Sequence, residues 1–289
     1  MDARSDVQLP GDREFRFRIG LRPVEPSRWL DIDELRAPEL QLKDELMAQR
    51  HGEVIASLPD TEAAAAELRD AVLAELADRR LVEVTGERVT EQTTGRVIDL
   101  AAMHPIEAAG RLVQEDWCLM APSPQGHRLV AASLCFPGRW RLADKIGRPM
   151  AAIHAPVPRY DSDVGPGTDR VLARLSPGRI VERFNWSVID DARLFQPTGH
   201  GAAPAPPDAV GEQIVLRTER QTLRGFSDGV VAFGIRTRVR RLAELTDSPQ
   251  VCGELADSIR RLPPEVAAYK SLGTMRDAVV SWLDVVAAG

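Results

Sequence analysis

Residues 214–239 read IVLRTERQTLRGFSDGVVAFGIRTRV, and this stretch decides the fold class. The runs 214–223 and 230–239 are rich in β-branched and apolar residues, which favours strands. The segment between them contains Asp228-Gly229, a dipeptide typical of hairpin turns. Two strands joined by a tight turn pair antiparallel, so the sequence predicts an antiparallel sheet in this half of the chain.

The same turn matches the G-x-S-x-G motif of serine hydrolases, from Gly225 to Gly229. That motif requires a helix immediately after the serine, whereas a strand pattern follows Ser227. The order Ser, Asp, His also fails, because no histidine follows His200. Gly165-Pro-Gly167 is no dinucleotide loop, since it lacks the third glycine and a preceding strand. Neither a serine hydrolase nor a nicotinamide enzyme is therefore expected.

Three further runs have strand character, at 117–120, 128–136 and 180–188. Residues 137–178, between the second and third of these runs, contain many prolines and predict short helices and loops. An antiparallel five-stranded sheet with short helices on one face satisfies this order. We expect an α+β fold of this kind, which has the element order of a PAS-like domain.

Helical spacing dominates both flanks of these strands. Helices are predicted from Pro38, after Asp60 as N-cap and from Pro105, with a weaker β-like run between the last two at 81–103. The C-terminal part predicts helices at 251–261 and 272–286, and residues 195–207 predict a flexible excursion. We expect N-terminal arm and helices over 1–114, the PAS-like core over 115–245, and C-terminal helices over 246–289.

Composition limits the class of protein. The 289 residues carry 37 Lys+Arg and 43 Asp+Glu, a net charge of −6, and no apolar run approaches the ~20 residues of a membrane helix. The N-terminus lacks the apolar core of a signal peptide, and three cysteines are too few for a disulfide framework. A cytoplasmic protein with reduced thiols is therefore expected. Nucleic-acid binding is disfavoured, because the densest basic run, Arg236–Arg241, predicts a solvated strand face.

His154 is the residue most suggestive of a cofactor. It lies between Ala151-Ala152-Ile153 and the stiff segment Pro156-Val-Pro158, so its imidazole is held by rigid backbone in apolar surroundings. Two interpretations stay open: a buried histidine bonded to backbone, or the axial ligand of a haem. His104, stiffened by Pro105, is the next candidate. The other three histidines are expected at the surface, namely His51, His127 and His200.

Four blocks in order resemble the haem-dependent oxidative N-demethylase family. They are Gly20–Pro23 through Arg50, Phe136–Tyr160, Arg183-Phe-Asn185-Trp186, and Leu216–Leu223 with Phe233–Thr237. The resemblance implies a PAS-like fold that binds haem b through His154 and oxidises a small secondary amine such as dimethylamine. Removing electrons from the N-methyl group would give an iminium, which water hydrolyses to a primary amine and formaldehyde. It also implies a redox partner, with the flavin or iron–sulfur module on a separate chain, and dioxygen as a possible co-substrate.

Side chains in these blocks are the candidates for particular roles. The substrate ammonium needs an anionic or aromatic wall, for which Glu219 and Tyr160 are candidates, and Asn185 is a candidate donor to an iron-bound ligand. Haem propionates need cations, for which we select Lys145, Arg183 and Arg220. The alternative for each charged residue is a structural ion pair, and for Asn185 a hydrogen bond within the sheet. Trp140 is a candidate contact of the porphyrin, although core packing is the favoured interpretation for it and for Trp186.

Two other functional classes fit the same sequence. One is a haem-based or small-ligand PAS-like sensor without catalysis, and the other is a scaffold that has lost haem. No output module of a sensor is evident in the sequence, which favours the enzyme.

Overall fold

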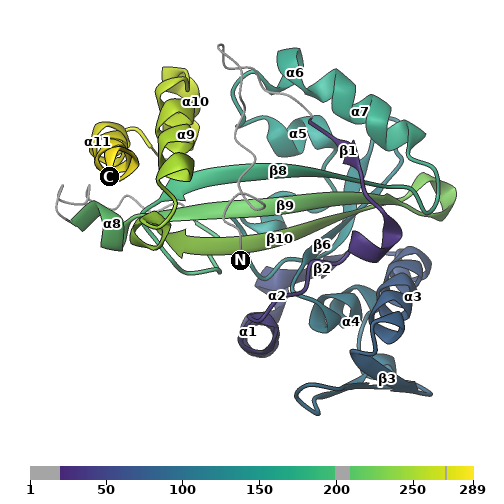
Figure 1. Cartoon of the computed structure of the whole chain (residues 1–289). Helices are drawn as coiled ribbons and strands as arrows, with labels where there is room; N and C mark the ends of the chain where they lie inside the picture. Colours follow the sequence, from purple (N-terminus) through teal and green to yellow (C-terminus); the bar gives the residue numbers. More distant parts are fainter. Residues whose placement is uncertain (1–19, 199–208, 271) are drawn as a thin grey trace.

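The computed structural model describes residues 20–198, 209–270 and 272–289, which form an α+β fold around one large antiparallel sheet (Figure 1). Its strands follow the order β1-β8-β9-β10-β6-β7-β2. They are β1 (Arg22–Pro23), β2 (Ile55–Ser57), β6 (Asp116–Ala121), β7 (Arg128–Ser133), β8 (Ile180–Ile189), β9 (Val215–Gly225) and β10 (Val231–Arg241). The antiparallel α+β prediction is confirmed, but the sheet has seven strands rather than five. The two additional edge strands span two and three residues, too short for a recognisable alternation.

The predicted hairpin is confirmed as β9 and β10, which pair from Val231↔Gly225 to Arg241↔Val215. Asp228 and Gly229 adopt positive φ angles of 53° and 71° in the connection, as a tight turn requires. Because a strand follows Ser227 where a nucleophile elbow needs a helix, the G-x-S-x-G match has no catalytic geometry.

Helices cover both faces of the sheet. Figure 1 shows α5 (Met150–His154), α6 (Tyr160–Asp163) and α7 (Gly165–Arg174) above the sheet. Below it lie α1 (Arg36–Gln49), α2 (His51–Val54), α3 (Glu62–Asp78) and α4 (Pro105–Leu112). At one end of β8–β10 lie α8 (Val210–Gln213), α9 (Pro249–Arg260), α10 (Pro264–Tyr269) and α11 (Arg276–Ala288). The short α10 is an element that the sequence pattern did not predict.

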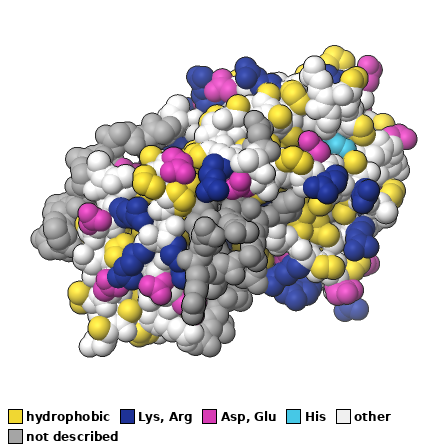
Figure 2. All heavy atoms as spheres, turned by 90° about the horizontal axis from the view of Figure 1, so that it is seen from above, with side chains coloured by type: hydrophobic (Ala, Val, Ile, Leu, Met, Phe, Trp, Pro, Cys, Tyr) yellow, Lys and Arg dark blue, Asp and Glu magenta, His cyan; other side chains and the backbone are white. Residues whose placement is uncertain are grey.

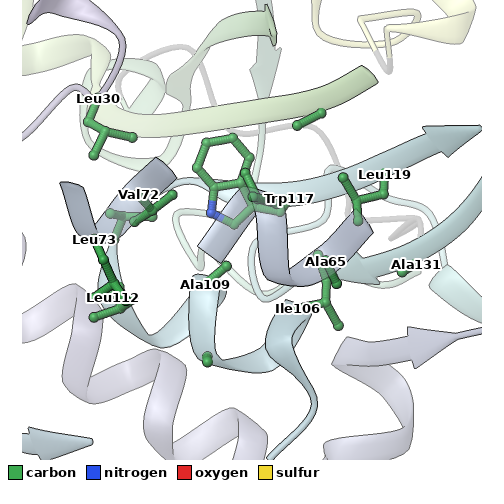
Figure 3. Close-up of a cluster of buried hydrophobic side chains, with 14 of the residues drawn as sticks. Leu30, Ala65, Val72, Leu73, Ile106, Ala109, Leu112, Trp117, Leu119 and Ala131 are labelled. Carbon is green, nitrogen blue, oxygen red and sulfur yellow. The ribbon is translucent and has the colours of Figure 1, made fainter. Parts of the chain in front are cut away.

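The largest core cluster joins the N-terminal helices to the sheet. Trp117 of β6 is fully buried and packs among side chains such as Val72, Ile106 and Leu119 (Figure 3). A second cluster seats Trp186 of β8 against the C-terminal helices, so Trp186 packs the core as its favoured interpretation predicted. Apolar burial on this scale, at roughly 25 cal/mol per Å², is the main force that holds the layers together.

The basic run at the end of β10 is exposed at Arg241, its last residue, but its first arginines are buried or half-buried. Arg236 is fully buried, with Nη2 2.7 Å from Asp33 Oδ2 and Nη1 2.9 Å from Glu39 Oε2. Arg238 forms ion pairs with Asp31 and Asp33. The prediction was wrong for Arg236 and Arg238 because these acidic partners come from residues 31–39, about 200 positions earlier, where no local pattern reveals them.

Smaller predictions have mixed outcomes. The β-like run at 81–103 is confirmed as a separate sheet of β3 (Val82–Thr85), β4 (Arg88–Glu91) and β5 (Val97–Asp99). Thr61, not Asp60, occupies the N-cap position of α3. The three cysteines are free thiols, all buried.

Two further points concern the chain as a whole. Most of the predicted excursion, residues 199–207, lies outside the described residues, as does His200. Among the helices that the structure describes, none combines the length and the apolar character that crossing a membrane requires.

Candidate functional site

His154 ends α5 with one ring nitrogen bound and the other open. Its Nδ1 lies 3.0 Å from the Met150 carbonyl oxygen, which can only accept, so Nδ1 carries the proton. Nε2 then presents its lone pair, and it forms no hydrogen bond with any residue in the described ranges. Metal-ligating histidines have this arrangement, because the backbone bond fixes the tautomer and the ring orientation.

Tyr160 lies flat on the His154 imidazole. The ring centroids are 4.6 Å apart and the planes differ by 8°. A ligand bond to Nε2 would lie in the plane of the imidazole, so a ring stacked on the face leaves that edge open. Tyr160 was predicted as a wall for substrate, and the structure places it where it orients His154.

Two cations lie near the imidazole. Burial, and to a smaller extent the positive charges of Lys145 and Arg183, lower the pKa of His154 to about 4. The imidazole is therefore neutral at pH 7, the form that binds a metal. Lys145 lies with Nζ 4.6 Å from the centroid of the Trp140 ring, so the structure brings these two predicted residues together beside His154.

Arg183 projects from β8 on the face that α5–α7 cover. Alternation along the strand gives Arg183 and Asn185 the same side as Val181, which packs in one cluster with Ile153 of α5. The guanidinium forms no ion pair or hydrogen bond with a described residue, and its Nε is buried without a partner. Glu219 is near enough for a coulombic interaction but does not pair with this guanidinium, whose donors therefore suit an anionic ligand.

A polar cluster continues along the same face. The register places Asn185 opposite Glu219 and Arg183 opposite Gln221. Glu219 Oε2 accepts hydrogen bonds from Asn185 Nδ2 at 3.2 Å and from Gln221 Nε2 at 2.8 Å. Its Oε1 lies 3.6 Å from Arg217 Nε. On this part of the sheet face, among the residues that the structure describes, Glu219 is thus the one carboxylate, and its neighbours are cations and amides.

Lys270, at the end of α10, completes the cluster, and sequence reasoning missed it. Its Nζ donates to the Trp186 carbonyl at 2.5 Å and approaches Asn185 Oδ1 at 3.4 Å. Burial lowers the pKa of Lys270 to about 8. The one available signal was compositional: three of the 37 basic residues are lysine, and this is one of them.

Arg220 does not join the other candidates. It points to the opposite face, where its guanidinium is bonded to Glu182 and to the carbonyls of Arg28 and Trp29. All these hydrogen bonds stabilise the fold, which matches the structural ion pair stated as the alternative for this residue.

The remaining histidines lie elsewhere. His104 caps α4, where its Nδ1 accepts from the Ile106 N–H, and His51 is exposed beside Glu107. His127 is buried and bonded to the Gly229 carbonyl, so the prediction that it lies on the surface was wrong. Its partner belongs to the β9–β10 turn about 100 residues away, which no local pattern indicates.

The molecule seen from the side of α5–α7 and α9–α11 is shown in Figure 2. Hydrophobic side chains on this side lie between lysine and arginine side chains. The donor set around His154 fits haem: one open imidazole nitrogen for iron, and Arg183 and Lys145 for propionates.

Fold and site together define an α+β protein in which one sheet face carries a histidine-centred ligand site. A comparison with known families agrees with the resemblance seen in the sequence. The family model described as haem-dependent oxidative N-demethylase, alpha subunit-like, matches residues 20–280. The chain belongs to this family, whose name points to an oxidoreductase that depends on haem and works with other subunits.

Proposed function

We propose that this chain is the haem subunit of an enzyme that demethylates a small secondary amine, with dimethylamine as the type of substrate. The observation that carries the proposal is His154, whose Nε2 is open while Met150 and Tyr160 fix its ring. The strand order β8-β9-β10-β6-β7, with α5–α7 between β7 and β8, supports the PAS-like character proposed for the core.

The residues around His154 would hold the cofactor. His154 would bind the iron of haem b, and Arg183 and Lys145 would neutralise the propionates, with Trp140 beside Lys145. Bound haem would supply the electron-transfer and dioxygen chemistry that side chains lack. A separate chain with a flavin or iron–sulfur module would exchange electrons with it, in keeping with the subunit character of the family.

The cluster at Glu219 would receive the amine nitrogen. Asn185 and Gln221 hold the carboxylate in place, so it can accept a proton from the substrate. Loss of two electrons and one proton converts dimethylamine to an N-methyl iminium, and water then adds to the C=N bond. Collapse of that adduct releases the amine as methylammonium, together with formaldehyde, so atoms and charge balance.

The function is tested with protein reconstituted with haem. We expect a Soret band, a spectral response to dimethylamine, and formaldehyde release when an electron acceptor is present. A haem spectrum that responds to amines without formaldehyde release would indicate a sensor. Absence of any haem spectrum would contradict the proposal.

Arg183→Met is expected to accelerate haem loss about tenfold or more, because one propionate loses its charge-assisted hydrogen bonds. The measurement is transfer of haem to excess apomyoglobin, followed by absorbance. Arg183→Lys keeps the charge and should lie between the variant and the unmodified protein. Arg179→Met, an exposed arginine just before β8, should lose haem at the original rate. Equal rates for Arg183→Met and Arg179→Met would remove Arg183 from the proposed site.

A further inference from the structure

The Glu219 carboxylate has one oxygen that accepts two hydrogen bonds and a second oxygen that faces an arginine. Oε2 accepts two amide donors, from Asn185 and Gln221, and Oε1 faces the Arg217 guanidinium. Arg217 is itself fixed, because its Nη2 donates to the Phe136 carbonyl at 2.5 Å and it is almost fully buried. An ammonium group that approached Oε1 would therefore lie against the fixed positive charge of Arg217.

The surrounding charge also opposes a cation. Arg183 and Lys270 lie close enough to Glu219 for coulombic interaction, in addition to Arg217. The other titratable side chain of α10 at this end is Tyr269, which is half-exposed and uncharged at neutral pH. Arg183 would be paired with a propionate in the haem-loaded protein, so among the described residues Glu219 is one negative charge facing two further positive ones, Arg217 and Lys270.

Neighbouring carboxylates do not restore the balance, because each already has a partner. Asp116, on β6, is fully buried and bonded to Lys43 and to the N–H groups of Cys135 and Phe136. Asp190, at the end of β8, forms an ion pair with Arg139. A cation entering beside Glu219 would therefore meet a site of net positive charge.

Lys270 is held where its charge keeps the site beside Glu219 net positive. Its ammonium is anchored to the Trp186 carbonyl and lies 4.9 Å from the centroid of the Trp186 ring. Its approach to Asn185 Oδ1 also directs the Asn185 amide group, so that Nδ2 faces Glu219. Lys270, at the end of α10, thus contributes positive charge and keeps the Asn185 amide hydrogen-bonded to Glu219.

We propose that the site admits its amine as the uncharged free base, and that Lys270 is the residue that excludes the ammonium form. This inference rests on the function proposed above and specifies the state of its substrate. The free base is the reactive form, because its nitrogen lone pair supplies electron density as the neighbouring C–H bond is broken. In the ammonium ion that pair is held by a proton.

The test is a titration of the haem-loaded protein with dimethylamine at several pH values, followed by the Soret band. Between pH 6 and 7.5 the free-base fraction of the amine rises about tenfold per pH unit, since the pKa of the amine lies well above this range. The apparent affinity should rise in the same proportion. His154 is neutral throughout this range, since its pKa is about 4.

Substitutions at position 270 separate charge from packing. Lys270→Gln keeps a donor for the Trp186 carbonyl but removes the charge, so the apparent affinity at pH 6 should rise about tenfold and the pH profile should flatten. Lys270→Met should do the same if it folds. Lys270→Arg keeps the charge and should retain the original profile below pH 8. Above about pH 8 Lys270 itself loses its proton. The unmodified protein should then begin to admit the ammonium form, whereas Lys270→Arg should still exclude it.

Arg276→Met is the matched control, because Arg276 ties the carbonyls of Ile259 and Arg260 in the same C-terminal helices without approaching Glu219. It should leave the profile unchanged. A flat profile in the unmodified protein, or a Lys270→Gln profile identical to it, would overturn the inference while leaving the amine-oxidising function intact. A haem-loaded protein that gives no response to the amine at any pH would overturn both.

Discussion

His154→Ala is expected to abolish the Soret band of protein reconstituted with haem. The variant removes the ring nitrogen that the described part of the site offers to iron, and the remaining contacts to a porphyrin would be apolar surface and two cations. We expect haem affinity to fall by at least a hundredfold, measured by absorbance titration. Added imidazole should restore part of the band, because the lost side chain leaves space beside Tyr160.

His104→Ala is the matched control for this experiment. His104 was the second candidate in the sequence, and it also precedes a proline, but its Nδ1 caps α4 on the other side of the sheet. This variant should keep a full Soret band, with a loss of stability of about 1 kcal/mol for the missing cap. A normal spectrum from His154→Ala would show that the ligand assignment is wrong and would remove the basis of the proposed function.

Arg236→Met should have the largest effect on folding. The guanidinium is fully buried between Asp33 and Glu39, so the substitution leaves Glu39 without its cation and Asp33 with Arg238 alone. Breaking a buried pair from one side costs roughly 3–5 kcal/mol, because an uncompensated charge stays behind. The measurement is the urea midpoint of unfolding, which is converted to a free energy of unfolding with a common denaturant slope for all variants.

Two further variants make this result specific. Arg241→Met, at the exposed end of the same strand, removes an ion pair with Glu212 in which both side chains are largely exposed, and should change stability by less than about 0.5 kcal/mol. Combining Arg236→Met with Asp33→Asn and Glu39→Gln should recover part of the loss, since no charge is then left unpaired. Equal midpoints for Arg236→Met and Arg241→Met would contradict the buried network.

The separation of the two faces of β9 matters for both experiments. Arg220 and Glu219 are adjacent in sequence, yet alternation sends Glu219 toward α5–α7 and Arg220 toward Trp29. Variants on the first face should therefore change ligand binding, and variants on the second should change stability. The same alternation explains why Arg220, selected together with Arg183 for propionates, has a structural role.

The sequence by itself determined the antiparallel hairpin, the five long strands and most helices, and it singled out His154 as the candidate ligand. These features depend on local patterns, namely side-chain alternation, turn residues and fixed backbone angles. Each such pattern can be recognised within a short segment of the sequence. Only the tertiary structure decided that Arg236 is buried, that Tyr160 lies on His154, and that Lys270 reaches Asn185 across 85 positions. Contacts of that kind depend on which elements pack together, and burial and charge pairing follow from that packing rather than from the neighbouring residues in sequence.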